Sequence, residues 1–263
     1  MSDFRFQPLP LGQRIPASPH AVSCSLPTMR DVRGYEEKDP AITRHLTSGY
    51  PRFVVHPFAR QLAEHLVATT PALAGTTLWL TSSSRMADAL AAHLRSATGM
   101  QRIGRDGLHG VAHAATDRDA AARAKVFLQN IGGFISSREA EDHLVRLRLI
   151  AAPHVEEVFP HDATAEIRRQ LRRALPATSD QDVWLANCGM NAIYATFRAV
   201  SEIQAPRGRT IWLQLGWLYL DSIAILQKFT RSTADYVYVR DVFDLDGLTR
   251  IFNAHGHKIA GVI

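Results

Sequence analysis

Four short apolar runs alternate with three segments of helical length in the last third of the chain, and this alternation constrains the fold more than any other feature. The runs are rich in β-branched and aromatic residues, which favour strands. We predict strands at 183–186, 209–215, 235–241 and 258–263, and helices at 190–200, 219–229 and 244–254. Strands that alternate with single helices over short connections pair in parallel, with helices on both faces of the sheet. The sequence therefore predicts an α/β fold with a mainly parallel sheet.

A second set of elements precedes this region. A helix is predicted to begin near Pro57, because Pro favours the first helical position and Leu62, Leu66 and Val67 share one face. Further strands are predicted at 75–82 and 110–115 and further helices at 83–99, 120–128 and 137–149, the last with Ser136–Glu139 as a capping box. These elements indicate a separate, smaller α/β region.

The first fifty residues carry prolines at positions 8, 10, 16, 19 and 27. Because proline suppresses helix and favours extended backbone, we expect an extended N-terminal arm. The predicted organisation is an arm at 1–56, a helix with an inserted α/β subdomain at 57–180, and the first part of a larger domain at 181–263. The chain stops inside an apolar run, so it is expected to be a fragment.

Composition excludes several classes of protein. The two cysteines, Cys24 and Cys188, cannot build a disulfide framework or a Cys-rich zinc site. No apolar run is long enough to span a bilayer and the N-terminus has no apolar signal core, so no membrane association and a cytoplasmic location are expected. His109 and His113 lie four residues apart, but position 110 is glycine where a zinc-protease helix has glutamate, so no metal is expected.

The net charge of +5 is spread thinly, and its densest basic run is 166–175. The four arginines of this run share one face of a predicted helix, with no aromatic residue between them. Because bases stack on aromatic rings in single-strand binders, we interpret the run as a solvated helix face and expect no nucleic-acid partner.

The turn Cys188-Gly189-Met190 lies where a predicted strand passes into a helix. Ligands of parallel α/β sheets bind at the carboxyl ends of strands, and free N–H groups at a helix N-terminus favour an anion. Glycine would let a phosphate approach the backbone closely. The alternative interpretation is a small residue that serves packing at a tight turn.

Two other places could contribute to the same site. Tyr219 follows the next strand, where its ring could stack on a planar ligand or could simply be buried. Tyr50 and Arg52 flank a proline in the arm, and a phenol with a guanidinium makes a good set of phosphate ligands. The alternative for this pair is a packing tyrosine and a surface arginine.

The order of these elements resembles the pyridoxal 5′-phosphate (PLP) enzymes of cysteine and methionine metabolism. The matching segments are Tyr50-Pro-Arg52 before His56-Pro57, Cys188-Gly189-Met190-Asn191-Ala192, and Tyr219 to Ser222. A closer resemblance, to the long fungal-type cystathionine gamma-synthases, rests on Pro8–Thr28, Gly34–Glu37, the segment GYPRF and Gly133–Glu141. The chain departs from the family where Cys188 replaces serine and His56 replaces asparagine.

The resemblance implies a PLP-dependent transferase fold of type I, like that of aspartate aminotransferase, with an incomplete large domain. It implies that the amides of Gly189 and Met190 hold the cofactor phosphate. Tyr219 would stack on the pyridine ring and assist proton transfer, as the one catalytic residue in this chain. Tyr50 and Arg52 would reach the phosphate of a neighbouring subunit's cofactor, which implies a homodimer or homotetramer.

The activity that the resemblance implies is gamma-replacement, in which an activated homoserine ester and cysteine give cystathionine. Sulfide addition to the ester and gamma-elimination are alternatives within the family, and a non-catalytic module that pairs with other subunits is an alternative outside it. The family's Schiff-base lysine follows the strand that 258–263 resembles. None of Lys38, Lys125, Lys228 and Lys258 lies in such a context, so we expect this chain to be inactive alone.

Overall fold

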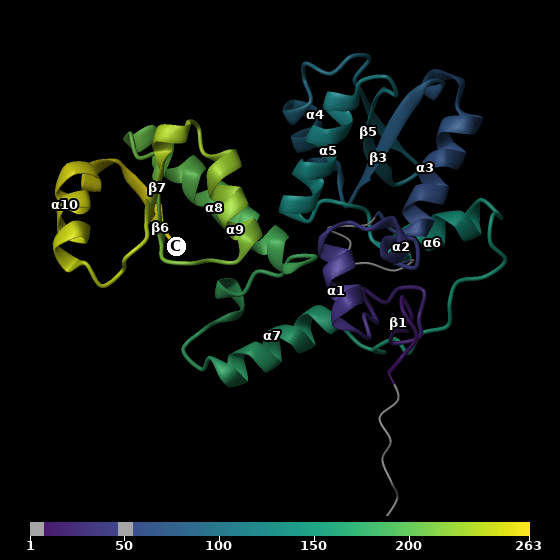
Figure 1. Cartoon of the computed structure of the whole chain (residues 1–263), viewed down its shortest axis with the longest axis horizontal. Coiled ribbons are helices and arrows are strands. Elements are labelled where there is room, and N and C mark those ends of the chain that lie inside the picture. The colour runs from purple at the N-terminus through teal and green to yellow at the C-terminus, as the bar shows by residue number, and fades with distance from the viewer. Residues whose placement is uncertain (1–7, 47–54) are drawn as a thin grey trace, which may run out of the picture. The chain divides into compact units, whose positions relative to one another are not determined.

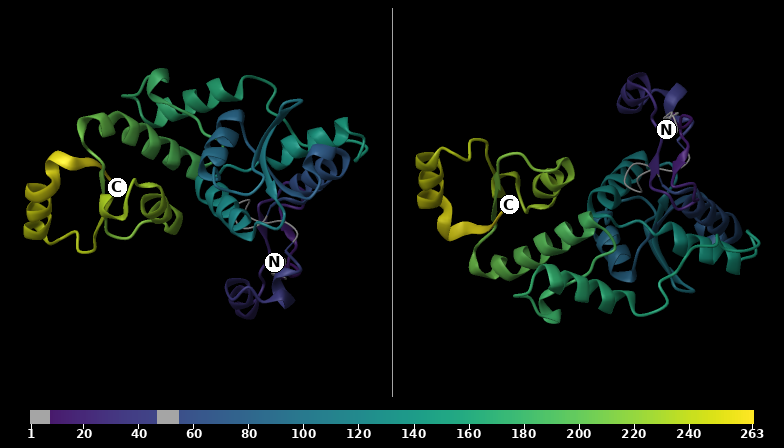
Figure 2. Two further views of the ribbon diagram at one scale, coloured as in Figure 1. Left: turned by 90° about the horizontal axis from the view of Figure 1, so that it is seen from above. Right: turned by 90° about the horizontal axis from the view of Figure 1, so that it is seen from below.

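The computed structural model describes residues 8–46 and 55–263, and these form two compact units (Figures 1 and 2). Unit 1 comprises Met1–Gln129 with Gly133–Glu156, and unit 2 comprises Asn130–Gly132 with Glu157–Ile263. The structure thus joins the arm region and most of the predicted subdomain in one unit. The functional division predicted at 56 and 180 stays a prediction.

Unit 1 begins with a small antiparallel pair, β1 (Arg14–Ile15) with β2 (Ser23–Cys24), followed by α1 (Met29–Glu36) and α2 (Pro40–Thr43). The expectation of an extended arm is wrong for these two helices. Thr28 and Asp31 form a reciprocal capping box, in which the Asp31 N–H donates to Thr28 Oγ1 at 3.2 Å and the Thr28 N–H donates to Asp31 Oδ2 at 3.0 Å. Pro40 occupies the first turn of α2, where its missing N–H costs nothing.

The main sheet of unit 1 is antiparallel, in the order β3-β5-β4. Its strands are β3 (Thr76–Thr81), β4 (Gln101–Arg105) and β5 (Leu108–Ala114). The sequence reasoning missed β4. The signal was present, because Asp106 and Gly107 join β4 to β5 with φ values of 52° and 82°, the conformation that Asp-Gly favours in a two-residue hairpin.

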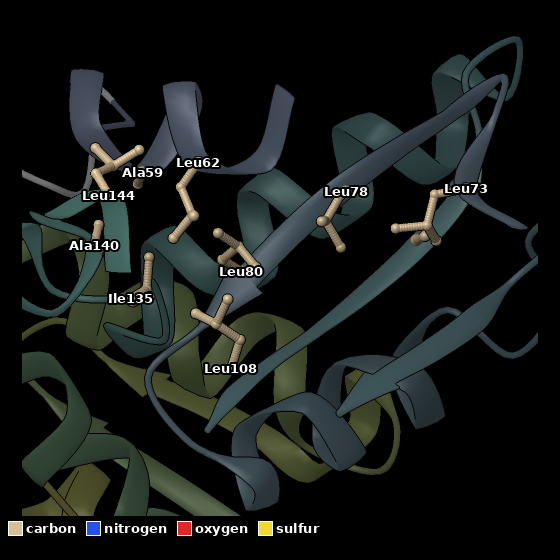
Figure 3. Packing of buried hydrophobic residues seen from close by; sticks show 10 residues of the cluster. Ala59, Leu62, Leu73, Leu78, Leu80, Leu108, Ile135, Ala140 and Leu144 are labelled. Atoms are coloured by element: carbon tan, nitrogen blue, oxygen red, sulfur yellow. The ribbon is translucent and has the colours of Figure 1, made fainter. Parts of the chain in front are cut away.

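Helices α3 (Pro57–Thr69), α4 (Ser84–His93), α5 (Arg118–Ile131) and α6 (Ser137–Arg146) accompany this sheet, with a short 3₁₀ turn η1 (Pro71–Leu73) before β3. Leu62 of α3, Leu80 of β3 and Leu144 of α6 belong to one buried cluster (Figure 3). The α/β character predicted for this region is confirmed. α4 ends several residues before the predicted stop at Gly99.

Unit 2 contains a parallel sheet in the order β7-β6-β8. Its elements are α7 (Ala163–Ala174), η2 (Asp180–Asp182), α8 (Gly189–Gln204), η3 (Ala205–Arg207), β6 (Ile211–Leu215), α9 (Leu220–Phe229), η4 (Thr233–Asp235), β7 (Tyr236–Val239), α10 (Leu245–His255), η5 (Gly256–Lys258) and β8 (Ile259–Val262). The helices and the last three strands predicted for this region are all present. The α/β class with a parallel sheet is confirmed.

Helices cover the two faces of this sheet unequally. Phe197 of α8 packs on Trp212 of β6 with ring centroids 4.9 Å apart, and Ile225 and Leu226 of α9 complete the same core. α10 lies on the opposite side of the sheet (Figures 1 and 2), but none of its residues is buried. Helices therefore lie on both faces of the sheet, as predicted, but they pack tightly against one face only.

The predicted strand at 183–186 is wrong. These residues form no strand, and Trp184 is 88% exposed. An apolar, β-branched run becomes a strand only where a neighbour accepts and donates its backbone hydrogen bonds, and no described strand lies alongside it. The extended segment instead leads directly into the N-terminus of α8.

The arginine-rich run forms α7, none of whose residues is buried. Arg169 pairs with Glu166 at 2.5 Å and Arg172 pairs with Asp180 at 3.1 Å. Hydrogen bonds from Arg169 and Gln170 lower the pKa of Glu166 to about 2. Two of the arginines on this helix are thus already paired with carboxylates. Among the helices in the described part of the chain, none is long and apolar enough to cross a membrane.

Candidate functional site

The starts of α8 and α9 define one edge of the unit 2 sheet. β6 pairs in parallel with both of its neighbours, and it lies between these two helices in the chain. A helix that precedes a parallel strand, and a helix that follows it, both run against the strand direction. The N-termini of both helices therefore lie at the carboxyl edge of the sheet, where ligands of such sheets bind.

The N-terminus of α8 is open. Its N-cap Cys188 has extended backbone, with φ −160° and ψ 167°, and its side chain makes no capping hydrogen bond. The first backbone bond at this end runs from the Ala192 N–H to the Cys188 carbonyl at 3.1 Å. The N–H groups of Gly189, Met190 and Asn191 have no acceptor within the described ranges, so these donors and the positive end of the helix dipole remain unused, with Gly132 close to the Asn191 nitrogen.

No neighbouring atom crowds Gly189 on the side where a side chain would start. A Cβ placed on this residue would meet no atom within 4 Å. The Met190 side chain is buried in the core with Phe197 and Trp212. Packing and anion binding are therefore compatible here, because the side chain of Met190 packs while its N–H remains available. The donor set and the open space fit the phosphate of a PLP group.

Tyr219 is the N-cap of α9 and is 53% exposed. It follows the turn at Gly216, which has a positive φ of 63°, and Trp217, which is 77% exposed. Burial of Tyr219, the alternative interpretation from sequence, is not observed. A half-exposed ring at this edge has a face accessible to a planar ligand, although its stacking role stays a prediction.

The sequence reasoning missed a segment that holds the start of α8. The Asn187 side-chain amide donates to the Gly132 carbonyl at 3.2 Å, and the Asn191 amide donates to the Ile131 carbonyl at 3.3 Å. Gly132 has a φ of 66°, and a Cβ there would lie 2.2 Å from Cys188 Sγ. Only glycine fits this approach. The paired glycines 132 and 133 were the available signal.

Asn130 ties the same segment to α9. Its buried side-chain amide donates to Asp221 Oδ1 at 3.0 Å, and its side-chain carbonyl accepts from Lys228 Nζ at 3.0 Å. Asp221 and its neighbour Ser222 are both buried. This network fixes the first turn of α9 and therefore the position of Tyr219. It also engages the amine of Lys228.

Tyr50 and Arg52 lie outside the described residues, so their role as phosphate ligands stays a prediction. The helix that follows them begins as expected. Pro57 occupies the first position of α3, and His56 takes the capping place, where its Nδ1 accepts from the Phe58 N–H at 3.2 Å. A ring nitrogen thus caps the helix at the position where the resembling family has asparagine.

Comparison with known proteins finds two kinds of relative, a dechlorinase/desaturase and cystathionine gamma-synthases. The chain is 40% identical over 249 residues to L-2-amino-4-chloropent-4-enoate dechlorinase/desaturase of Streptantibioticus cattleyicolor, covering 95% of this chain and 49% of that protein. It is 25% identical over 358 aligned positions to cystathionine gamma-synthase of Neurospora crassa, covering 92% and 58%. A 58-residue stretch is 48% identical to a putative cystathionine gamma-synthase of Saccharomyces cerevisiae, covering 22% and 9%.

No family model matches the chain, and no solved structure matches it. The chain spans about half the length of the curated relatives that it matches over most of its own length. The resemblance to cystathionine gamma-synthases is thus supported by named relatives, while the more extensive identity is to the dechlorinase/desaturase. The chain is similar, over nearly all of its residues, to one half of enzymes that carry these two names.

Proposed function

We propose that this chain belongs to the PLP-dependent enzymes of cysteine and methionine metabolism and carries the phosphate-binding part of their site. The observation that supports this most directly is the open start of α8, with its three N–H donors and the empty space above Gly189. The extensive identity to a named amino-acid dechlorinase/desaturase and the weaker identity to cystathionine gamma-synthase support the same assignment.

The roles of the residues follow from their places. The N–H groups of Gly189 and Met190 would hold the phosphate, and Tyr219 would stack on the pyridine ring and help to move a proton. Asn130 and Gly132 would keep the starts of α9 and α8 in position. When bound, PLP supplies an electron sink that acidifies the hydrogens next to the substrate's amino group.

The substrate would be an L-amino acid with a leaving group on its gamma carbon. The dechlorinase name specifies a chlorine on the fourth carbon of a 2-amino acid, which is the gamma carbon. An activated homoserine ester carries its acyl group on the same carbon. We infer a reaction that expels a gamma substituent, with chloride and an acyl group as the two candidates. Homo-oligomer formation, with Tyr50 and Arg52 at a neighbouring site, belongs to the same proposal.

An assay with two substrates separates these reactions. The protein would be incubated with PLP and either 2-amino-4-chloropent-4-enoate or an acyl-homoserine with cysteine, while chloride and cystathionine are measured. Chloride release alone favours the dechlorinase activity, and cystathionine formation favours the synthase. PLP binding without either product agrees both with the expectation that this chain is inactive alone and with the alternative of a non-catalytic pairing module.

Phosphate recognition is tested by equilibrium dialysis with PLP and with pyridoxal, which lacks the phosphate. PLP should bind at least about tenfold more tightly, a difference of about 1.4 kcal/mol. Gly189→Asp places a carboxylate at the helix start and should abolish this preference. Gly256→Asp is the matched control, because a Cβ at Gly256 also meets no atom within 4 Å. Equal binding of both compounds would contradict the proposed cradle.

A further inference from the structure

A cavity of about 130 Å³ lies at the edge of the unit 2 sheet opposite to the starts of α8 and α9. The ends of both helices and the beginning of β6 line it. Pockets that enclose a drug-sized ligand measure about 300–1,000 Å³, so this cavity has room for a small ligand or for one group of a larger one. β6 spans five residues, which separates the cavity from the proposed PLP site by roughly 16 Å at about 3.3 Å per residue.

Three arginines line this cavity, and each comes from a different part of unit 2. Arg198 belongs to α8, Arg209 lies in the loop before β6, and Arg231 follows the end of α9. The α8 positions that line the cavity are 198, 201, 202 and 205, a spacing that places them on one helix face. Tertiary packing therefore brings the three arginines together, and they are not neighbours on a single solvated helix.

The arginines of the cavity wall outnumber its carboxylates. Among the described residues, one acidic side chain lines the cavity, that of Glu202, and it already pairs with Arg198 at 2.7 Å. Arg209 and Arg231 form no ion pair with any residue in the described part of the chain. The nearby Asp235 does not line the cavity, and its carboxylate accepts hydrogen bonds from two hydroxyl groups. The cavity wall thus carries two arginines without a counterion.

A hydroxyl group and an apolar surface complete the cavity wall. Ser201 Oγ accepts a hydrogen bond from the Trp212 Nε1–H at 3.1 Å. The Ser201 O–H has no acceptor of its own within residues 8–46 and 55–263, so it remains available as a donor. Trp212 and Ala260 are buried and line the same cavity together with Phe229. Because apolar walls lower the local dielectric, they strengthen the attraction between a guanidinium and an anion.

We infer that this cavity binds a tetrahedral oxyanion, a phosphate or sulfate group, through Arg209, Arg231 and the Ser201 hydroxyl. A guanidinium presents its donors in a planar fork that matches two oxygens of such a group, and hydrogen bonds between charged partners are stronger than neutral ones. The apolar surface of Trp212 and Phe229 would also accommodate the organic part of a phosphate ester. The site lies at the edge of the sheet away from the start of α8, so it does not depend on the proposed function.

The indole groups of the four tryptophans allow the cavity to be observed by NMR. Trp212 reports on it through the bond to Ser201, whereas Trp217 lies before α9 at the opposite edge of the sheet. Trp79→Phe, Trp184→Phe and Trp217→Phe, made one at a time, assign the four indole signals by difference. Inorganic phosphate, added to the full chain at constant ionic strength, should shift the Trp212 signal and should reach saturation at millimolar or lower concentrations.

Charge variants separate a defined site from general attraction of anions to a basic protein. Arg209→Gln and Arg231→Gln should each weaken phosphate binding at the Trp212 signal at least about tenfold. Arg207→Gln removes the same charge at an exposed position outside the cavity and should bind like wild type. Gly189→Asp changes the start of α8 at the opposite edge and should leave the Trp212 response unchanged, so failure of the proposed PLP cradle and failure of this cavity are distinguishable.

A second probe distinguishes the two sources of the bound group. Phenyl phosphate that binds at least about tenfold more tightly than inorganic phosphate would assign the cavity to a phosphate ester, and a smaller difference would assign it to the free oxyanion. A Trp212 shift that does not saturate, or phosphate binding that Arg207→Gln weakens as much as Arg209→Gln does, would overturn the proposal. The arginines would then only complement the negative ends of α8 and α9.

Discussion

His56 joins the start of α3 to the N-terminal segment through both nitrogens of its ring, and replacing it should reveal a pH-dependent contribution to stability. Nδ1 accepts the Phe58 N–H at 3.2 Å, and the Nε2–H donates to the Pro19 carbonyl at 2.7 Å. Only the neutral ring can accept at Nδ1. Protonation would therefore remove the cap and place a positive charge at the positive end of the helix dipole.

The surroundings of His56 also favour the neutral ring. Burial lowers the pKa of His56, and the nearby charges of His20 and Arg14 lower it further, while the Pro19 carbonyl and Glu141 act in the opposite direction. The His20 ring is stacked with the His56 ring at a centroid distance of 6.2 Å. Because the folded pKa is below the unfolded one, the stabilisation is present above about pH 6.5 and is lost as pH falls through the folded value.

The magnitude can be estimated from the two hydrogen bonds. Loss of a helix cap costs about 1 kcal/mol, and loss of the bond to Pro19 costs about 1 kcal/mol more. His56→Ala should therefore lower the free energy of unfolding of unit 1 by about 2 kcal/mol at pH 7.5. His56→Asn retains a capping side chain and should cost about half of that. Wild type should lose part of its free energy of unfolding toward pH 5 as His56 becomes protonated. Neither variant has this histidine, so neither should show that loss.

Hydrogen exchange of the buried β5 amides, measured from pH 7.5 to pH 5 and corrected for the intrinsic exchange rate, reports the stability of unit 1 alone. His45→Gln, at an exposed position after α2, is the control and should keep the pH profile of wild type. If His56→Asn loses protection toward pH 5 as steeply as wild type does, the reasoning about His56 is refuted.

Three further perturbations test other parts of the structure. Phe197→Ala removes the ring that packs on Trp212 and should destabilise unit 2 by about 3–5 kcal/mol in urea unfolding; a cost below about 1 kcal/mol would contradict its core role. Glu141→Ala removes the carboxylate that bonds the buried His20 ring at 3.0 Å and should cost about 1–3 kcal/mol, again by urea unfolding, whereas a neutral effect would show that the pair contributes nothing. Gly132→Ala should weaken PLP binding measured by dialysis, because its Cβ would lie 2.2 Å from Cys188 Sγ; unchanged affinity would show that this approach does not position α8.

Helix starts were predictable because their causes are local. Pro57 and Asp244 lie at helix starts in the structure as in the sequence reasoning, and Ser83 caps α4. Each start depends on hydrogen bonds within three or four residues, so a single sequence contains the information. The hairpin at Asp106-Gly107 is local too, because this dipeptide itself favours the turn that joins β4 to β5.

The candidate site was predictable only in part. The aromatic residue at the start of α9 follows from the strand–helix alternation, whereas the strand predicted before the glycine at the start of α8 is absent. The segment Asn130–Gly132 could not be placed from sequence, because its bonds to Asn187, Asn191 and Asp221 join residues 55 to 91 positions apart. Contacts over such separations depend on how the whole unit packs.

The sequence by itself determined the helices in the last third of the chain, because periodicity and capping act over a few residues. Only the tertiary structure decided which apolar runs became strands and in what order they pair. Residues 211–215 have neighbours on both sides and form the central strand β6, whereas 183–186 have none and remain outside the sheet. A strand is completed by hydrogen bonds to another segment, and that partner cannot be read from the strand's own residues.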